Sequence, residues 1–112
     1  IYYKRANKKR FKRCDAFLYK RRGTKALKKI FERAFGVLAV VDKTREIYFL
    51  GNVKFHIDCV KKLGSFVEVE VFGHANRTKP EKLKKQCRFY QRLLGISKKD
   101  LLADSYSDQI LR

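Results

Sequence analysis

Acidic residues are scarce in this sequence. Its 112 residues include 11 Asp and Glu against 29 Lys and Arg, so the net charge is +18 at pH 7. Such a positive field attracts phosphate-rich partners, which include nucleic acids, anionic membranes and nucleotides. Charge alone does not choose among these three classes.

The residue spacing that a zinc site needs is also absent. Cys14, Cys59 and Cys87 are far apart, and no Cys-x-x-Cys pair or Cys/His ligand pattern surrounds them. Three thiols in a basic chain are typical of a reducing compartment, so we expect a cytoplasmic location. No apolar run approaches the roughly 20 residues of a membrane-spanning helix, so we expect no membrane partner.

The sequence lacks an initial Met. Its first residue is Ile1, which already lies in a β-prone run. We therefore expect these residues to be the C-terminal part of a longer protein. Their number fits one small domain.

Apolar spacing predicts a mixture of strands and helices. The predicted strands are residues 1–5, 14–19, 37–49, 53–60 and 66–72, with a last short strand at 105–111. Short connections make successive strands antiparallel neighbours. Thr24 is expected to cap a helix that Gly36 ends, and Pro80 to begin a second helix that reaches Leu94. Tyr106, in the tail, is expected to pack rather than to take part in chemistry.

Charged side chains alternate with apolar ones along the central strands. Glu68 and Glu70 share one strand face, opposite Val67, Val69 and Val71. The other strands follow the same pattern, with a charged face formed by Lys43, Arg45, Lys54, His56 and Asp58. By itself such a face is usually the solvated side of a sheet.

The particular combination favours a second interpretation. Carboxylates two positions apart on a strand point the same way, roughly 7 Å from each other. Oxygen ligands at that spacing suit Mg²⁺ or Mn²⁺, which also take substrate phosphates. Guanidinium and ammonium groups on adjacent strands would hold those phosphates.

Two stretches of the sequence resemble the CYTH domain, the family of triphosphate tunnel metalloenzymes. They are residues 41–48 and 53–70, and the most specific part is Leu63-Gly64-x-Phe66-x-Glu68-x-Glu70. The tail from Ser105 resembles the branch of class IV adenylyl cyclases. The resemblance implies an α+β fold, an antiparallel β-barrel that forms a tunnel with helices packed outside. We expect residues 1–112 to be the C-terminal portion of one such domain, with an incomplete barrel, because the family's N-terminal Glu-x-Glu-x-Lys strand is absent.

The resemblance also assigns roles to individual residues. It implies phosphate binding by Arg5, Lys12, Lys43, Arg45 and Lys54. It implies metal binding by Asp58, Glu68 and Glu70, with His56 as a further possible ligand. The expected cofactor is Mg²⁺ or Mn²⁺.

Two classes of function stay open at this stage. The first is a metal-dependent triphosphatase or adenylyl cyclase, whose substrate would be ATP, thiamine triphosphate or inorganic triphosphate. The second is a non-catalytic basic module that binds polyphosphate or RNA, although no nucleic-acid-binding motif is present.

Overall fold

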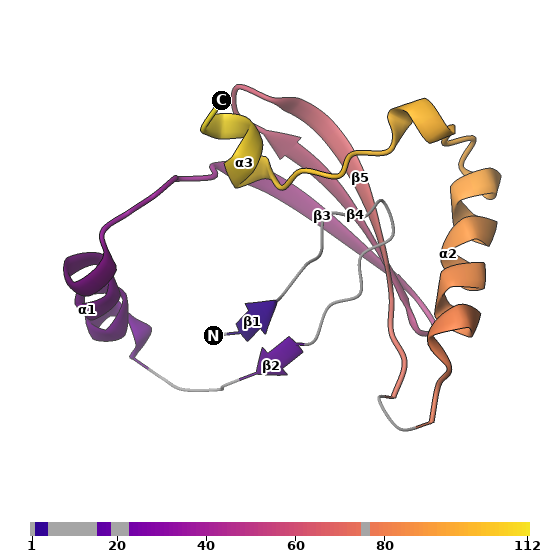
Figure 1. Ribbon diagram of the computed structural model, residues 1–112, viewed down its shortest axis with the longest axis horizontal. Helices are drawn as coiled ribbons and strands as arrows, with labels where there is room; N and C mark the ends of the chain where they lie inside the picture. Colours follow the sequence, from indigo (N-terminus) through magenta and orange to yellow (C-terminus); the bar gives the residue numbers. More distant parts are fainter. Residues whose placement is uncertain (1, 5–15, 19–22, 75–76) are drawn as a thin grey trace. The chain divides into compact units, whose positions relative to one another are not determined.

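The computed structural model describes residues 2–4, 16–18, 23–74 and 77–112 (Figure 1). The chain divides into two compact units, residues 1–40 and residues 41–112. Each unit is described by itself.

The first unit contains a short hairpin and one helix. Strand β1 (Tyr2–Lys4) pairs antiparallel with strand β2 (Ala16–Leu18), which confirms the predicted hairpin. Helix α1 (Thr24–Phe35) has Gly23 as its N-cap, so the prediction that Thr24 caps it was wrong by one residue. Gly36 ends this helix as predicted, with a φ of 73° that favours glycine.

The second unit is built on a three-stranded antiparallel sheet. Strand β4 (Val53–Val60) lies in the centre, between β3 (Lys43–Leu50) and β5 (Gly64–Val71). A tight turn at residues 51–52 joins β3 to β4, as predicted. The predicted α+β class with antiparallel neighbours is therefore confirmed.

Strand β3 is shorter than predicted, because residues 37–42 lie outside it. Its first residue, Lys43, pairs with Val60, and Val60 is the last residue of β4. The chain then turns, and the ladder extends by one hydrogen bond from the Lys61 amide to the Asp42 carbonyl, at 2.9 Å. Residues 37–41 lie beyond the end of β4, so β4 offers them no residue to pair with.

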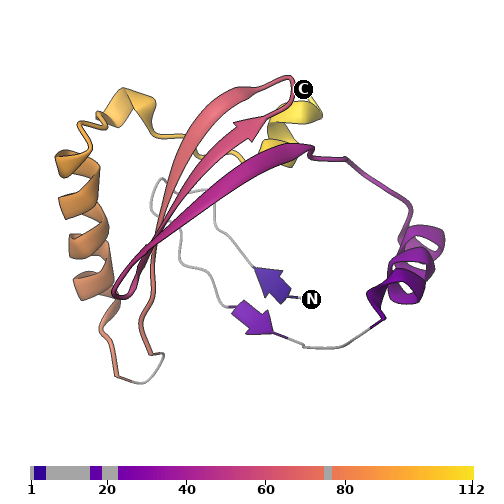
Figure 2. The same ribbon diagram turned by 180° about the vertical axis from the view of Figure 1, so that it is seen from behind.

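Helices cover the two faces of this sheet at opposite ends (Figures 1 and 2). Helix α2 (Pro80–Leu93) packs on the face of Val53 and Phe55, where the Tyr90 ring meets the Phe55 ring edge-on at 5.1 Å. Helix α3 (Tyr106–Ile110) packs on the other face, where the Tyr106 ring lies 4.9 Å from the Phe66 ring. The charged side chains of the sheet, except Glu46, lie on the face of α3.

The chain ends in a helix, so the prediction of a last strand at residues 105–111 was wrong. Ser105 and Asp108 form a reciprocal capping box, in which each side chain bonds the other's backbone N–H. That local signal outweighs the short alternation of apolar residues that suggested a strand. A similar capping box of Ser97 and Asp100 begins a short 3₁₀ helix at Lys98–Asp100.

None of the helices in the described parts of the chain has the length and apolar character that a membrane crossing requires. In the described ranges the three strands of the second unit form an open sheet.

Candidate functional site

Strand register brings the charged side chains of three strands onto one side of the sheet. Across the sheet Arg45 lies opposite Asp58, His56 opposite Glu68, and Lys54 opposite Glu70. Residues in directly opposite positions share a face, so these groups are neighbours. We call this surface the charged face, which consists of Lys43, Arg45, Lys54, His56, Asp58, Glu68 and Glu70.

Asp58 lies at the centre of the hydrogen bonds on the charged face. It is 1% exposed, and its carboxylate accepts both arms of the Arg45 guanidinium, from Nε to Oδ1 and from Nη2 to Oδ2, each at 2.6 Å. Lys43 Nζ donates to Oδ2 at 3.0 Å. Two cations are thereby held beside one buried anion. The Arg45 pair is bidentate, a geometry that fixes the orientation of the guanidinium group.

The two glutamates continue this network on β5. Arg45 Nη2 also donates to Glu68 Oε2 at 2.9 Å, and His56 Nδ1 lies 3.2 Å from the same oxygen. His56 is 5% exposed, and its Nε2 lies 3.8 Å from Glu70 Oε2. The imidazole therefore lies between the two carboxylates that the sequence singled out.

The charges on this face keep the Asp58 carboxyl in its ionised form. The hydrogen bond from Arg45 holds the pKa of Asp58 well below its usual range, with smaller contributions from Lys43 and Tyr106, while burial opposes the shift. Asp58 therefore stays ionised at any neutral or mildly acidic pH. A permanent anion at this point keeps the neighbouring ammonium and guanidinium groups in place.

Tyr106 belongs to this network through its hydroxyl, whereas the sequence predicted only that it packs. Its hydroxyl donates to Asp58 Oδ2 at 2.9 Å, and Lys43 Nζ lies 4.9 Å from the centre of its ring. The pKa of Tyr106 is raised, first by burial and then by the bond to Asp58, so the hydroxyl keeps its proton. The capping box of Ser105 and Asp108 was the one local signal for the position of Tyr106, because it sets where α3 begins.

The remaining predicted residues lie apart from this network or outside the described residues. Lys54 Nζ lies over two aromatic rings, 4.3 Å from the centre of Phe72 and 5.6 Å from that of Phe49. Arg5 and Lys12 fall outside the described ranges. Of the nine residues that the sequence proposed, the structure thus brings six into one connected cluster.

The donor set on β5 fits a hard divalent cation. Glu68 and Glu70 supply carboxylate oxygens, and Mg²⁺ is commonly bound by one or two carboxylates together with waters and substrate phosphates. In the parts of the chain that the structure describes, no group of three or more His, Cys, Asp or Glu residues is arranged to hold a metal ion by itself.

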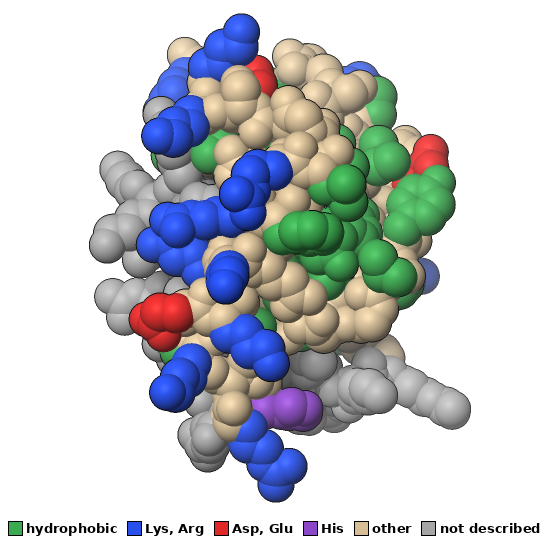
Figure 3. All heavy atoms as spheres, turned by 90° about the vertical axis from the view of Figure 1, so that its right-hand side faces the viewer, with side chains coloured by type: hydrophobic (Ala, Val, Ile, Leu, Met, Phe, Trp, Pro, Cys, Tyr) green, Lys and Arg blue, Asp and Glu red, His purple; other side chains and the backbone are tan. Residues whose placement is uncertain are grey.

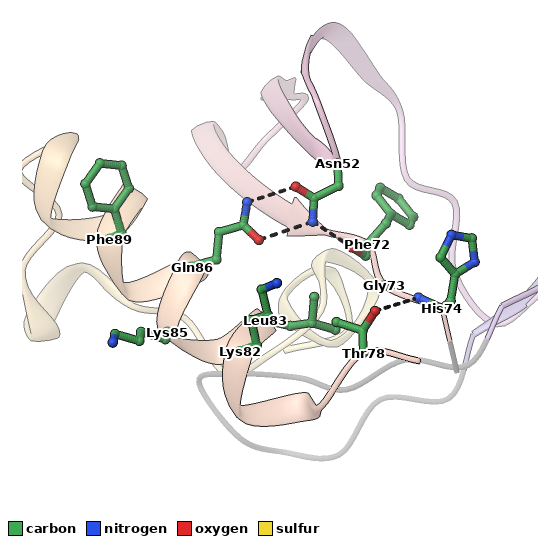
Figure 4. A pocket seen from close by; sticks show the side chains of 10 residues that line it. All are labelled: Asn52, Phe72, Gly73, His74, Thr78, Lys82, Leu83, Lys85, Gln86 and Phe89. Atoms are coloured by element: carbon green, nitrogen blue, oxygen red, sulfur yellow. Dashed lines mark hydrogen bonds between the residues drawn. The ribbon is translucent and has the colours of Figure 1, made fainter. Parts of the chain in front are cut away.

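A separate hollow of about 830 Å³ lies between the sheet and α2 (Figure 4). Asn52 and Gln86 exchange two amide hydrogen bonds across it, at 2.9 and 3.1 Å, which fix α2 to the turn after β3. Lys82, Lys85 and Phe89 line its helix side. None of its lining residues belongs to the charged face.

Comparison with known proteins identifies a domain type. The pattern of the CYTH domain matches residues 6–106. Among solved structures, the PH1012 protein from Pyrococcus horikoshii OT3 is 30% identical with a TM-score of 0.81, over 96% of this chain and 63% of that one. A conserved hypothetical protein from Pyrococcus furiosus is 21% identical with a TM-score of 0.78, over 94% of this chain and 63% of that one. No curated protein matches the chain.

Proposed function

Because the chain belongs to the CYTH domain family, the triphosphate tunnel metalloenzymes, we propose that its charged face binds the triphosphate group of a substrate for metal-dependent phosphoryl chemistry. The family binds triphosphate substrates and depends on metal ions in general. The chain spans 63% of the length of both solved relatives.

One observation carries this proposal. Lys43 and Arg45 are both held on the buried carboxylate of Asp58, directly beside Glu68 on the neighbouring strand. A sheet that needed only solubility would not bury an anion and surround it with donors, because burying charge costs free energy. The same arrangement suits a polyphosphate. It would bring more negative charge to Lys43 and Arg45 than the carboxylates that pair with them now.

Each group has a distinct role in this proposal. Lys43 and Arg45 donate hydrogen bonds to phosphate oxygens, and their charge stabilises the negative charge that develops during transfer. Glu68 and Glu70 would hold Mg²⁺ or Mn²⁺, which would supply Lewis-acid stabilisation of the phosphate charge. Lys54 contributes a further cation at the end of the same face.

The four hydrogen bonds at Asp58 support a different role for this residue from the metal ligand that the sequence suggested. A carboxylate has about four acceptor positions, and Arg45, Lys43 and Tyr106 direct four hydrogen bonds to this one, three of them to Oδ2. A metal ion at this carboxylate would have to compete with these donors and with their positive charge. We therefore assign Asp58 the part of an anchor that orients Lys43 and Arg45, and leave the metal to Glu68 and Glu70.

We also propose that further strands close the sheet into a barrel whose interior is the charged face. The position of α2 on the opposite face supports this arrangement, because it covers the apolar side of the sheet. The substrate would be ATP, thiamine triphosphate or inorganic triphosphate. Attack by water would make the enzyme a triphosphatase, and attack by a ribose hydroxyl on ATP would make it an adenylyl cyclase.

The test is metal-dependent turnover by variants of two glutamates. With Mg²⁺ or Mn²⁺, phosphate release from tripolyphosphate and ATP, and cyclic AMP formation from ATP, are measured for the wild type, Glu70→Gln and Glu46→Gln. We expect Glu70→Gln to lose about 100-fold or more in turnover, as for removal of a group that stabilises transition-state charge. Glu46 is the matched control, because it is exposed and lies, with its register partner Ile57, on the sheet face opposite the charged face.

Wild-type turnover by Glu70→Gln would contradict the proposed site. An equal loss in Glu46→Gln would show that the effect is not specific to the charged face. Both variants should unfold at nearly the wild-type temperature, since neither glutamate lies in the apolar core.

A second candidate function is nucleic-acid binding, which the composition of α2 favours. This helix carries five Lys and Arg against one Glu, and Figure 3 shows basic side chains gathered along this side of the molecule. Binding through such a surface weakens steeply as salt rises and needs no metal ion. A protein that binds RNA only at low salt, and turns over no triphosphate, would have this function instead.

A further inference from the structure

The hydroxyl of Tyr106 makes a contact that packing alone does not require. The ring already lies 4.9 Å from the Phe66 ring, which accounts for its apolar surface. The hydroxyl nevertheless points to the most buried carboxylate of the charged face and donates to Asp58 Oδ2 at 2.9 Å. An apolar ring in the same place would remove one of the four hydrogen bonds that this buried anion accepts.

This contact is one end of a continuous chain of polar groups. From Tyr106 it passes through Asp58 to Arg45 and on to Glu68, with distances of 2.9, 2.6 and 2.9 Å. Every link is a charge-assisted hydrogen bond, which is shorter and stronger than a neutral one. The last helix of the chain is thereby tied to the strand that carries the proposed metal ligands.

Tyr106 also limits where the Lys43 ammonium group can lie. Lys43 Nζ donates to Asp58 Oδ2 at 3.0 Å and lies 4.9 Å from the centre of the Tyr106 ring. The ammonium group thus contacts the ring and the carboxylate at once, and cation–π attraction adds to the ion pair. A flexible lysine is held on one side of the site before any ligand arrives.

We propose that Tyr106 is a positioning residue of the triphosphate site, whose hydroxyl fixes the Asp58 carboxylate on which Lys43 and Arg45 are oriented. The proposal rests on the proposed function, since it concerns the same cations. It adds α3 to the site. Tyr106 does not touch the ligand itself, and it acts by holding the donors in the geometry that a triphosphate needs.

Removal of the hydroxyl alone tests this proposal. Tyr106→Phe keeps the ring against Phe66 and loses the bond to Asp58. Calorimetry with magnesium tripolyphosphate should give a dissociation constant about five- to tenfold weaker than the wild type, which is less than the direct loss of a hydrogen bond to a charged group because the hydroxyl acts through Asp58. Tyr48→Phe is the matched control, because the exposed Tyr48 hydroxyl also donates to a carboxylate, that of Glu46 at 2.7 Å, on the opposite face. It should bind as the wild type does.

A double-mutant cycle separates positioning from packing. If Tyr106 acts through Asp58, the double variant Tyr106→Phe/Asp58→Asn should bind no more weakly than Asp58→Asn alone. Additive losses would overturn the proposal, because they would mean that the hydroxyl acts by another route. Circular dichroism of each variant confirms that it is folded.

The two proposals fail in different ways. A wild-type protein that binds no tripolyphosphate overturns the proposed function, and this inference with it. A wild-type protein that binds tripolyphosphate, with a Tyr106→Phe variant that binds it equally well, overturns the inference alone.

Discussion

Asp58 is the side chain at which most of the site's charged hydrogen bonds meet. It is 1% exposed, and it accepts hydrogen bonds from Arg45, Lys43 and Tyr106. A buried carboxylate is destabilising by itself, and these donors offset that cost. The residue therefore links the stability of the fold to the geometry of the proposed phosphate-binding groups.

This link predicts a pH-dependent stability. Arg45 depresses the pKa of folded Asp58, so the stabilisation is fully present above the unfolded pKa of about 4 and is lost as the pH falls toward the folded value. We expect Asp58→Asn to lower the free energy of unfolding by about 2–3 kcal/mol at pH 7, less than for a fully buried pair because Lys43 and Arg45 are a quarter exposed. Urea unfolding of both proteins between pH 7 and pH 3 should show this difference shrinking below about pH 4.

Asp42→Asn provides the comparison for that series. Asp42 pairs with Lys61 at 3.7 Å, and both side chains are about 70% exposed, so its loss should change stability by a few tenths of a kcal/mol at most. A gap between wild type and Asp58→Asn that stayed constant from pH 7 to pH 3 would contradict the electrostatic role of Asp58.

Single residues were predictable where a regular strand fixes their direction. The alternation around Glu68 and Glu70 defines a face, and the register then places Arg45 and His56 beside them. The role of Tyr106 was not predictable, because its contact with Asp58 spans 48 positions of the chain. No local pattern encodes where a terminal helix docks.

Helix α2 fixes one side of the sheet through a small number of aromatic contacts. The Tyr90 ring meets Phe55 edge-on at 5.1 Å, and Val53 beside it is 1% exposed. We expect Tyr90→Ala to cost about 2–3 kcal/mol of unfolding free energy, which reflects a half-buried ring. Leu93→Ala in the same helix should cost less than about 1 kcal/mol, because Leu93 is 68% exposed. Thermal or urea unfolding of the two variants measures this difference, and equal losses would show that α2 does not dock through Tyr90.

Elements with a strong local signal were predicted well. Val53–Val60 was predicted to the residue, and α2 begins at Pro80 as expected. The errors at β3 and at the tail have physical causes, since β3 is limited by the length of its partner strand and the tail follows its capping box. Pairing length is a tertiary property that the sequence of one strand does not contain.

The net charge of +18 gives the whole molecule an affinity for polyanions that needs no specific site. This general attraction competes with the proposed role of the charged face as an explanation for phosphate binding. The two explanations differ in one respect. General attraction depends on the number of charges, whereas a site depends on where each charge lies.

The most direct measurement compares two lysines that carry the same charge. Lys43 bonds the buried Asp58, whereas the Lys61 side chain is 72% exposed. The dissociation constant of magnesium tripolyphosphate is measured by calorimetry at about 0.15 M salt, where surface charges are screened beyond about 8 Å. We expect Lys43→Ala to weaken binding about tenfold or more, or about 1.4 kcal/mol, and Lys61→Ala to change it less than about twofold. Equal weakening by the two variants would contradict a triphosphate site on the charged face.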